Sequence, residues 1–134
     1  MANDGERLRL TMDAREINEF FAPPKINLPN VLHPIGLEGE KWYTKIDFSD
    51  AFNHVRFTKE FSRWFAFDYK NKRYVWQHMG FGWNMAPAVF QTIIEAVCKH
   101  INTETGLRSW AFYDDILFAS HSGEELKEKT KLAA

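Results

Sequence analysis

Three acidic residues interrupt apolar, strand-like segments, and they limit the possible folds more than any other feature of the chain. Asp47 ends the run at residues 42–46, and Asp114 and Asp115 lie between apolar residues within 107–120. Burying a carboxylate without a partner costs at least several kcal/mol, so a chain that places three in apolar surroundings usually supplies a cation. The pattern therefore predicts a metal site.

The acids are far apart in the chain, so only tertiary folding could bring Asp47 next to Asp114 and Asp115. A sheet with two adjacent central strands would do so. Clustered carboxylates suit Mg²⁺, and two such ions can activate an attacking hydroxyl and stabilise a leaving oxygen in phosphoryl transfer. The pattern thus favours phosphoryl-transfer chemistry, although an Asp-Asp pair is also common in ordinary turns.

Length and composition favour a single packed domain. The chain has 134 residues, of which 45% are hydrophobic and 16% aromatic, which excludes a disordered tail and favours a strand-containing core. The formal net charge of -1 gives no overall attraction to nucleic acid, so such a ligand would depend on local basic positions and on metal.

Alternating apolar residues and strand-forming residue types predict several short strands. They are expected at 7–12, 42–46, 63–67, 73–76, 109–112 and 116–119. The strands at 63–67 and 73–76 are expected to form a hairpin. The last two would form a tight strand-turn-strand with the acid pair at its tip.

Helical periodicity is clearest after Asn84, a candidate cap, and Pro87, a first-turn proline. The apolar residues that recur every three or four positions there are Ala86, Phe90, Ile93, Ile94, Val97, Cys98 and Ile101. A short helix or turn is expected at 13–20, a loop across 22–34 and a charged helix at 124–132. The residues expected in the core include Trp42, Trp64 and Trp76.

Several classes of protein have little support. No run of eighteen apolar residues exists and the N-terminus lacks the order of a signal peptide, so an intracellular protein with no membrane partner is expected. The single cysteine, Cys98, excludes an internal disulfide and is expected to be a buried hydrophobe. The five histidines never fall at i, i+4 or in a Cys/His cluster, so a structural zinc site has little support.

Four blocks of sequence, at 9–18, 45–52, 79–91 and 112–115, together resemble the reverse transcriptases of retroviruses and gypsy-like LTR retrotransposons. The first is similar to a fingers strand followed by the Asp-x-Arg-x-Leu-Asn signature, and the second, Lys-Ile-Asp-Phe-Ser-Asp-Ala-Phe, to palm motif A. The third is similar to the Leu-Pro-Phe-Gly-Leu...Ala-Pro-x-x-Phe-Gln block that leads into the long palm helix. The fourth, Phe-Tyr-Asp-Asp, is similar to Tyr-x-Asp-Asp. Each block is weak alone, but four in the family's order are specific.

The resemblance implies an α+β fold, with a polymerase palm-type antiparallel sheet, helices packed on one face and part of the fingers. Residues 1–134 would be one truncated fingers-palm domain. The implied activity is that of an RNA-directed DNA polymerase, a nucleotidyltransferase that adds deoxynucleotides to a primer 3′-hydroxyl. The implied partners are an RNA or DNA template with its primer, deoxynucleoside triphosphates and the remaining regions of a larger polyprotein.

The metal ligands follow from the same resemblance. It implies that Asp47 and Asp114 bind two Mg²⁺ ions, for which Mn²⁺ could substitute. Asp115 would assist, and the backbone carbonyl of Phe48 would add a ligand.

The resemblance also implies a nucleotide site in the second block. The backbone amides of Asp50 and Ala51 would face the incoming triphosphate, and Phe52 would be the bulky gate beneath the sugar. An aromatic ring there would clash with a ribose 2′-hydroxyl, so deoxynucleotides should be preferred. The alternative for Phe52 is a core aromatic.

Further contacts are implied outside that block. Arg9 would hold the β and γ phosphates, a task that suits a planar and permanently charged group. Phe81 and Gly82 would contact nucleotide and template, where a glycine allows close approach, although Phe81 could equally be simple packing. Arg15 and Asn18 would position template or fingers, although Arg15 could equally form a local pair with Asp13.

The chain departs from the family pattern in three ways. Phe112 replaces the usual tyrosine and Gly80 the usual proline, and neither change removes a metal ligand. The outer fingers, thumb and RNase H regions are expected to be missing, which should weaken the hold on a primer-template and make it salt-sensitive. Two other functions stay open: a catalytically inactive or co-opted remnant that binds nucleic acid or another partner, and a two-carboxylate hydrolase.

Overall fold

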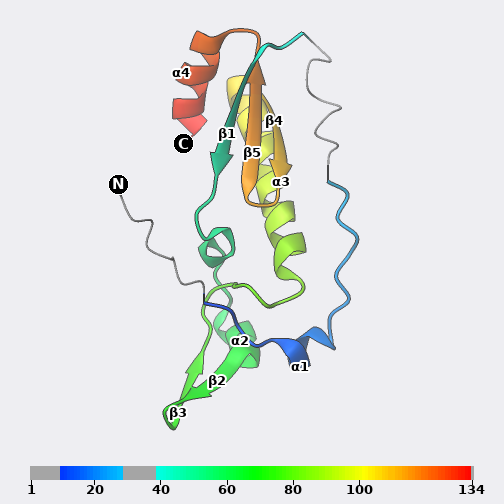
Figure 1. The fold of residues 1–134 in the computed structure, drawn as a ribbon, viewed down its shortest axis with the longest axis vertical. Coiled ribbons are helices and arrows are strands. Elements are labelled where there is room, and N and C mark those ends of the chain that lie inside the picture. The colour runs from blue at the N-terminus through cyan, green and yellow to red at the C-terminus, as the bar shows by residue number, and fades with distance from the viewer. Residues whose placement is uncertain (1–9, 29–38, 134) are drawn as a thin grey trace, which may run out of the picture. The chain divides into compact units, whose positions relative to one another are not determined.

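The structure is a computed structural model that describes residues 10–28 and 39–133. The chain divides into two compact units (Figure 1). The first unit comprises Met1–Pro23 and Phe52–Ala86, and the second comprises Pro24–Ala51 and Pro87–Ala134.

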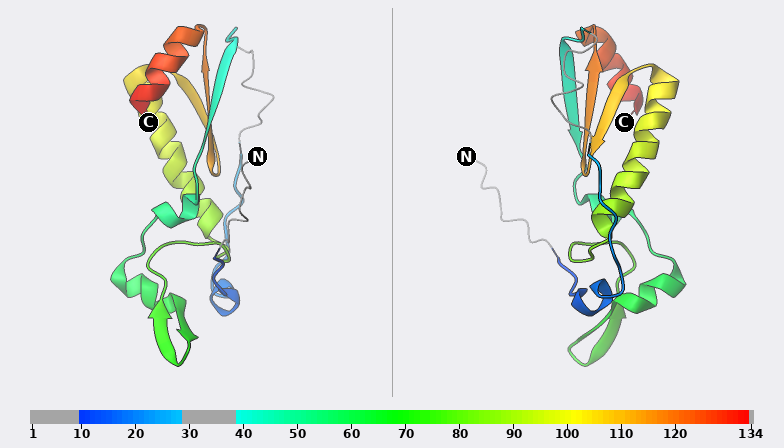
Figure 2. Two further views of the ribbon diagram at one scale, coloured as in Figure 1. Left: turned by 60° about the vertical axis from the view of Figure 1, so that its left-hand side comes forward. Right: turned by 90° about the vertical axis from the view of Figure 1, so that its right-hand side faces the viewer.

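A three-stranded antiparallel sheet forms the centre of the second unit. Its strands are β1 (Trp42–Asp47), β5 (Asp115–Ser120) and β4 (Arg108–Phe112), in the order β1-β5-β4. The helices α3 (Ala86–Thr105) and α4 (Gly123–Ala133) lie on one face of this sheet (Figure 2). The expected α+β architecture with helices on one face is therefore confirmed.

Strand alternation gives the two faces of this sheet different residues. The helix-covered face carries Ile116 and Phe118 of β5 and Ala111 of β4, which are all buried, and it forms the core of the unit together with Phe90 and Ile94 of α3. The opposite face, which we call the open face, carries the alternate residues, including Asp47 and Asp115.

The buried residues of the long helix follow the predicted periodicity, except at two positions. Ile93 and Val97, expected in the apolar stripe, are exposed, so the buried stripe is narrower than predicted. The prediction that Asn84 caps this helix is wrong. Its side-chain amide donates instead to the backbone carbonyls of Asn18 and Phe21, at 3.2 and 3.1 Å, and its Oδ1 accepts no hydrogen bond.

The first unit is built from short elements around an aromatic cluster. The elements are α1 (Arg15–Asn18), η1 (Ala51–His54, which begins at the boundary between the units), α2 (Lys59–Ser62), η2 (Arg63–Phe65), β2 (Ala66–Tyr69) and β3 (Lys72–Val75). The rings of the cluster, with centroids 4.6–6.3 Å apart, belong to Phe21, Phe57, Phe61, Phe65 and Trp83. Because the helices and strands of this unit are short, packing of these large aromatic rings supplies most of its buried apolar surface.

Two strand predictions in this unit need correction. The hairpin is present, but its first strand begins at Ala66, because the Thr58 side chain caps a helical turn that continues through η2. Of the strand predicted at 7–12, residues 7–9 lie outside the described residues, and Thr11 forms only an isolated bridge with Phe81.

The tryptophan predictions are largely wrong. Trp64 is 71% exposed and Trp42 is 55% exposed, while Trp76 is half-buried. Cys98 is buried, as expected, and burial raises the pKa of its thiol. None of the helices in the two described stretches is both long enough and apolar enough to cross a bilayer.

Candidate functional site

The fold brings the three predicted acids to one end of the β1-β5 pair. Asp47, the last residue of β1, is directly opposite Asp115, the first residue of β5, so both side chains belong to the open face. Asp114 immediately precedes Asp115, and its backbone carbonyl accepts a 2.8 Å hydrogen bond from the amide of Phe48. The prediction that adjacent strands carry Asp47 and Asp115 is therefore confirmed, but β1 is an edge strand of the described sheet and not a central one.

Asp114 lies in a tight, two-residue turn. Tyr113 and Asp114 alone connect β4 to β5, and Tyr113 has a φ of 52°. A left-handed conformation costs a residue other than glycine about 1–2 kcal/mol, so other contacts must hold the turn in place.

The buried side chain of Gln91 in α3 supplies these contacts. Its Oε1 accepts a 2.7 Å hydrogen bond from the Tyr113 amide, and its Nε2 donates to the Ala111 carbonyl at 3.2 Å and to Glu95 Oε1 at 2.8 Å. Sequence analysis did not single out Gln91. Its position directly after Phe90, in a largely apolar part of the helix, could have indicated a buried amide that forms hydrogen bonds.

Removing this amide gives a testable prediction. Gln91→Leu keeps the volume but leaves the half-buried Tyr113 amide without its acceptor, so we expect the free energy of unfolding to fall by about 1–3 kcal/mol. Urea denaturation measures this change, and amide hydrogen exchange at Tyr113 should accelerate. Thr92→Val, at the adjacent exposed helix position, should change stability by less than about 0.5 kcal/mol. Equal effects of the two substitutions would contradict the role of Gln91.

A lysine that sequence analysis also missed binds at the acids. Lys45 lies two residues before Asp47 on the same face, diagonal to Asp115, and its Nζ donates to Asp115 Oδ2 at 3.0 Å. The Asp115 carboxylate raises the pKa of the Lys45 ammonium through this hydrogen bond and its charge, and the charges of Asp47 and Asp114 add to the effect. All three acids thus act on a single cationic group.

The donor chemistry at this place fits a divalent cation. Asp115 Oδ1 is buried and accepts no hydrogen bond, although it lies 3.0 Å from Lys45 Nζ in the ion pair. The ammonium therefore shows that a cation is stabilised beside these carboxylates. Within residues 10–28 and 39–133, no three His, Cys, Asp or Glu side chains already converge as a metal-binding group. Exchanging Lys45 for a metal ion would require the carboxylates to reorient.

The candidate nucleotide residues of the first unit lie together. The rings of Phe52 and Phe81 are 5.1 Å apart between centroids, tilted at 54°. The Gly82 carbonyl accepts a 2.9 Å hydrogen bond from the Asn18 side chain, whose Oδ1 in turn accepts from the Asn84 amide at 2.9 Å. These bonds join the segment around residue 18 to the segment around residue 82.

The structure gives an intramolecular reason for glycine at position 82. Its φ is 113°, and a Cβ built there would lie 2.1 Å from the backbone oxygen of Met12. The chain's own backbone therefore occupies the space of a side chain, whether or not a template also approaches.

Of the remaining predicted residues, the structure describes Asp50, Ala51 and Arg15. Asp50 adopts a φ of 52° in the turn before η1, and Ala51 is buried at the start of η1. Arg9 lies outside the described residues. Arg15 forms the alternative local pair, with its guanidinium nitrogen 2.6 Å from Asp13.

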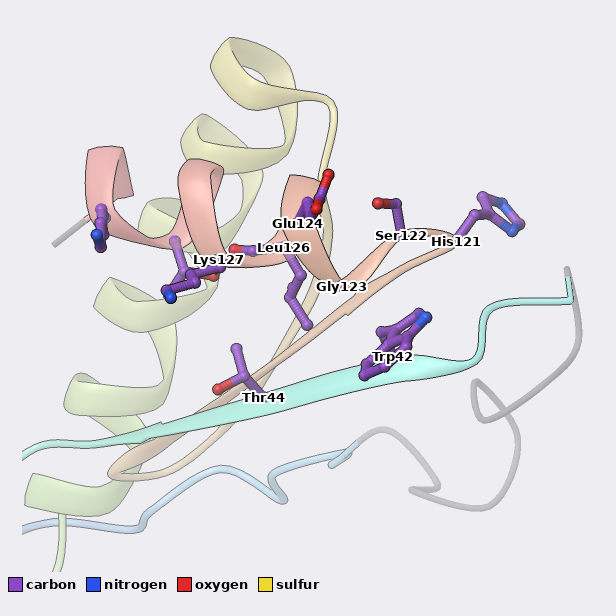
Figure 3. A pocket seen from close by; sticks show the side chains of 10 residues that line it. Trp42, Thr44, His121, Ser122, Gly123, Glu124, Leu126 and Lys127 are labelled. Carbon is purple, nitrogen blue, oxygen red and sulfur yellow. Dashed lines mark hydrogen bonds between the residues drawn. The ribbon is translucent and has the colours of Figure 1, made fainter.

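A hollow of about 960 Å³ in the second unit lies away from the acids. It is lined by Trp42 and Thr44 of β1 and by residues of α4 such as Leu126 (Figure 3). Trp42 and Thr44 alternate with Lys45 and Asp47 along β1, so the hollow belongs to the helix-covered face. The Trp42 ring lies so close to Gly123 that a Cβ there would be 3.0 Å away.

Comparison with known proteins gives a consistent result. The family described as reverse transcriptase (RNA-dependent DNA polymerase) matches residues 3–133. Similar curated proteins include the retrovirus-related Pol polyprotein from transposon 297 of Drosophila melanogaster, 28% identical over 90% of this chain and 11% of the relative. Polyprotein P3 of Commelina yellow mottle virus is 33% identical over 87% of this chain and 6% of the relative. The chain thus spans about a tenth or less of these relatives.

A solved structure is similar in fold. The foamy viral protease-reverse transcriptase, determined in complex with double-stranded DNA, superposes with a TM-score of 0.75 at 23% sequence identity. The match covers 99% of this chain and 23% of that one.

Proposed function

The chain belongs to the reverse transcriptase (RNA-dependent DNA polymerase) family, and we propose that it carries the catalytic acids of an RNA-directed DNA polymerase. The reaction would be the transfer of a deoxynucleotide to a primer 3′-hydroxyl. Both compact units would be parts of one fingers-palm domain, and the regions that complete the enzyme would belong to a larger polyprotein.

The observation that carries this proposal is the pairing of Asp47 with Asp115 across the β1-β5 ladder, with Asp114 in the adjoining turn. Three carboxylates at one end of a sheet repel one another unless a cation lies among them. A buried Gln91 holds the strained turn that presents Asp114, which is expected of a site where geometry matters more than local stability.

Asp47, Asp114 and Asp115 would hold divalent ions, Mg²⁺ or Mn²⁺, with the Phe48 carbonyl as a further ligand. Two such ions, when bound, activate an attacking hydroxyl and stabilise the leaving oxygen of an in-line displacement. Lys45 would neutralise part of the negative charge before the ions bind. The left-handed turn at Asp50 supports a role for the Asp50 and Ala51 amides in triphosphate binding, because turns of this kind can direct backbone N–H groups toward an anion.

Primer extension tests the proposal. A labelled primer annealed to RNA or DNA template would be incubated with deoxynucleotides at low salt, with Mg²⁺ or with a chelator, using this chain and a version extended through the following region of the polyprotein. Mg²⁺-dependent extension is expected, at least from the longer protein. Complete absence of extension from both proteins would contradict the catalytic proposal and leave an inactive nucleic-acid-binding or interaction domain.

Sugar selectivity tests the proposed role of Phe52, which contacts Phe81. With Phe52→Val, we expect the preference for deoxynucleotides over ribonucleotides to fall about tenfold or more, because the clash with the 2′-hydroxyl is removed. The measurement is the ratio of incorporation efficiencies for the two sugars. Phe20→Val, at an exposed ring of the same unit, serves as the control. Unchanged selectivity in Phe52→Val would refute the gate and favour a packing role.

A further inference from the structure

The β2-β3 hairpin of the first unit has two chemically different faces. The register pairs Phe67 with Tyr74 and Tyr69 with Lys72, so these four side chains share one face, which we call the aromatic face. Asp68, which pairs with Arg73, belongs to the opposite face. All eight strand residues are exposed, so neither face is covered by the core of the unit.

The aromatic face carries large rings that remain accessible. Phe67 and Tyr74 stack with their centroids 5.6 Å apart and an interplanar angle of 22°, and they are 43% and 44% exposed. Trp76, directly after β3, lies 5.7 Å from Phe67 between ring centroids. Soluble proteins rarely expose a contiguous aromatic surface of this kind unless it binds a partner or ligand.

Charge distinguishes the two faces further. On the opposite face, Arg73 is bound to Asp68 at 3.1 Å, so its charge is neutralised within the hairpin. On the aromatic face, Lys72 shares the surface with the rings, and the Nζ of Lys70 lies 5.3 Å above the ring of Tyr69. Residues 56–78 contain six Lys or Arg and two Asp or Glu, a local charge of +4 in a chain whose net charge is -1. This surface is complementary to a polyanion.

We propose that the aromatic face is a stacking platform for the unpaired bases of single-stranded nucleic acid. Phe67 and Tyr74 would stack on bases while Lys70 and Lys72 neutralise phosphates, the combination by which proteins bind single strands without reading sequence. Only the identification of this single strand as the template rests on the proposed function.

The base of the hairpin offers room for a base to enter. A hollow of about 660 Å³ opens there, lined by Phe67, Tyr74 and Trp76 together with Leu10 and Asn53. This volume falls within the range of sites that enclose small molecules. Asp13, a carboxylate in the same lining, is already bound by Arg15, which reduces its repulsion of a phosphate.

Binding of a labelled 12-nucleotide oligo-dT, measured by fluorescence anisotropy at low salt with chelator present, tests the platform on the full 134-residue chain. Phe67→Leu with Tyr74→Leu keeps apolar bulk but removes both π-faces, so we expect at least about tenfold weaker binding. Asp68→Asn with Arg73→Gln, on the opposite face of the same ribbon, leaves the net charge unchanged and should alter affinity less than about twofold. Far-UV circular dichroism and thermal midpoints should be the same for both double variants.

Salt and duplex measurements separate stacking from charge. Lys70→Gln with Lys72→Gln should reduce the slope of log affinity against log salt by about 1.4. The double variant with Phe67→Leu and Tyr74→Leu, which we call the leucine pair, should leave this slope unchanged. A blunt duplex with the same number of phosphates should bind the leucine pair and the wild type equally. The proposal is overturned if the leucine pair binds oligo-dT as the wild type does. It is overturned equally if the leucine pair loses duplex affinity to the same extent, or if its only defect is in self-association measured by sedimentation.

The test is independent of catalysis. Asp114→Asn should bind oligo-dT like the wild type in chelator. If the leucine pair binds oligo-dT weakly but the wild-type protein extends no primer, only the proposed function is refuted. If the wild-type protein extends primers but the leucine pair binds oligo-dT normally, only the platform is refuted.

Discussion

Asp114→Asn is expected to reduce Mg²⁺-dependent primer extension at least about 100-fold. The substitution keeps the size of the side chain but removes one of three negative charges at the end of the β1-β5 pair. A metal-ion site contributes several kcal/mol of transition-state stabilisation, and each 1.4 kcal/mol corresponds to a factor of ten in rate. The rate of the first nucleotide addition is the measurement, in whichever protein, this chain or its extended version, supports extension.

Stability separates loss of chemistry from loss of folding in this variant. Asp114 is exposed and removing it relieves repulsion among the acids, so the thermal midpoint in chelator should stay the same or rise. Millimolar Mg²⁺ should raise the midpoint of the wild type more than that of the variant, because a ligand stabilises only the state that binds it. Asp68→Asn, at a surface ion pair of the first unit, provides the control and should extend primers normally. Wild-type activity in Asp114→Asn would remove the metal-site interpretation.

Gly82→Ala is expected to lower the free energy of unfolding by about 2–6 kcal/mol. A Cβ at this position would lie 2.1 Å from the Met12 backbone oxygen, and the φ of 113° is unfavourable for any residue with a side chain. Left-handed strain and forced displacement of packed backbone each cost about 1–3 kcal/mol. The bridge between Thr11 and Phe81, next to this contact, should separate. Urea denaturation measures the loss.

Two alanine controls divide this effect into its parts. Gly80→Ala places its Cβ 3.1 Å from the flexible Met12 Cε, which can move aside, so the cost should stay below about 1 kcal/mol. Gly106→Ala has a φ of 68° but only the Lys129 ammonium within 4 Å, so it reports left-handed strain of about 1–2 kcal/mol with little clash. If Gly82→Ala costs no more than Gly106→Ala, the backbone contact is not the reason for glycine.

Much of the local structure could be predicted from residue order. The strand-forming residues before Asp47, the helical spacing from Ala86 to Ile101 and the acid pair between two apolar runs each reflect a preference that acts over a few residues. The errors occurred where a partner distant in sequence overrides such a preference. The Asn84 side chain donates to the Asn18 carbonyl instead of capping the helix, and Trp42 lies over Gly123 at the surface instead of entering the core.

By itself, the sequence determined which segments could be strands and helices, which acids were candidates for binding a cation, and which family the chain resembles. These depend on spacing and residue type, which act locally along the chain. Only the tertiary structure decided that Asp47 meets Asp115 in register, that Lys45 binds there, and that Gln91 holds the turn bearing Asp114. Each of these contacts joins residues at least twenty positions apart, and strand register and helix packing select them among many alternatives with similar local preferences.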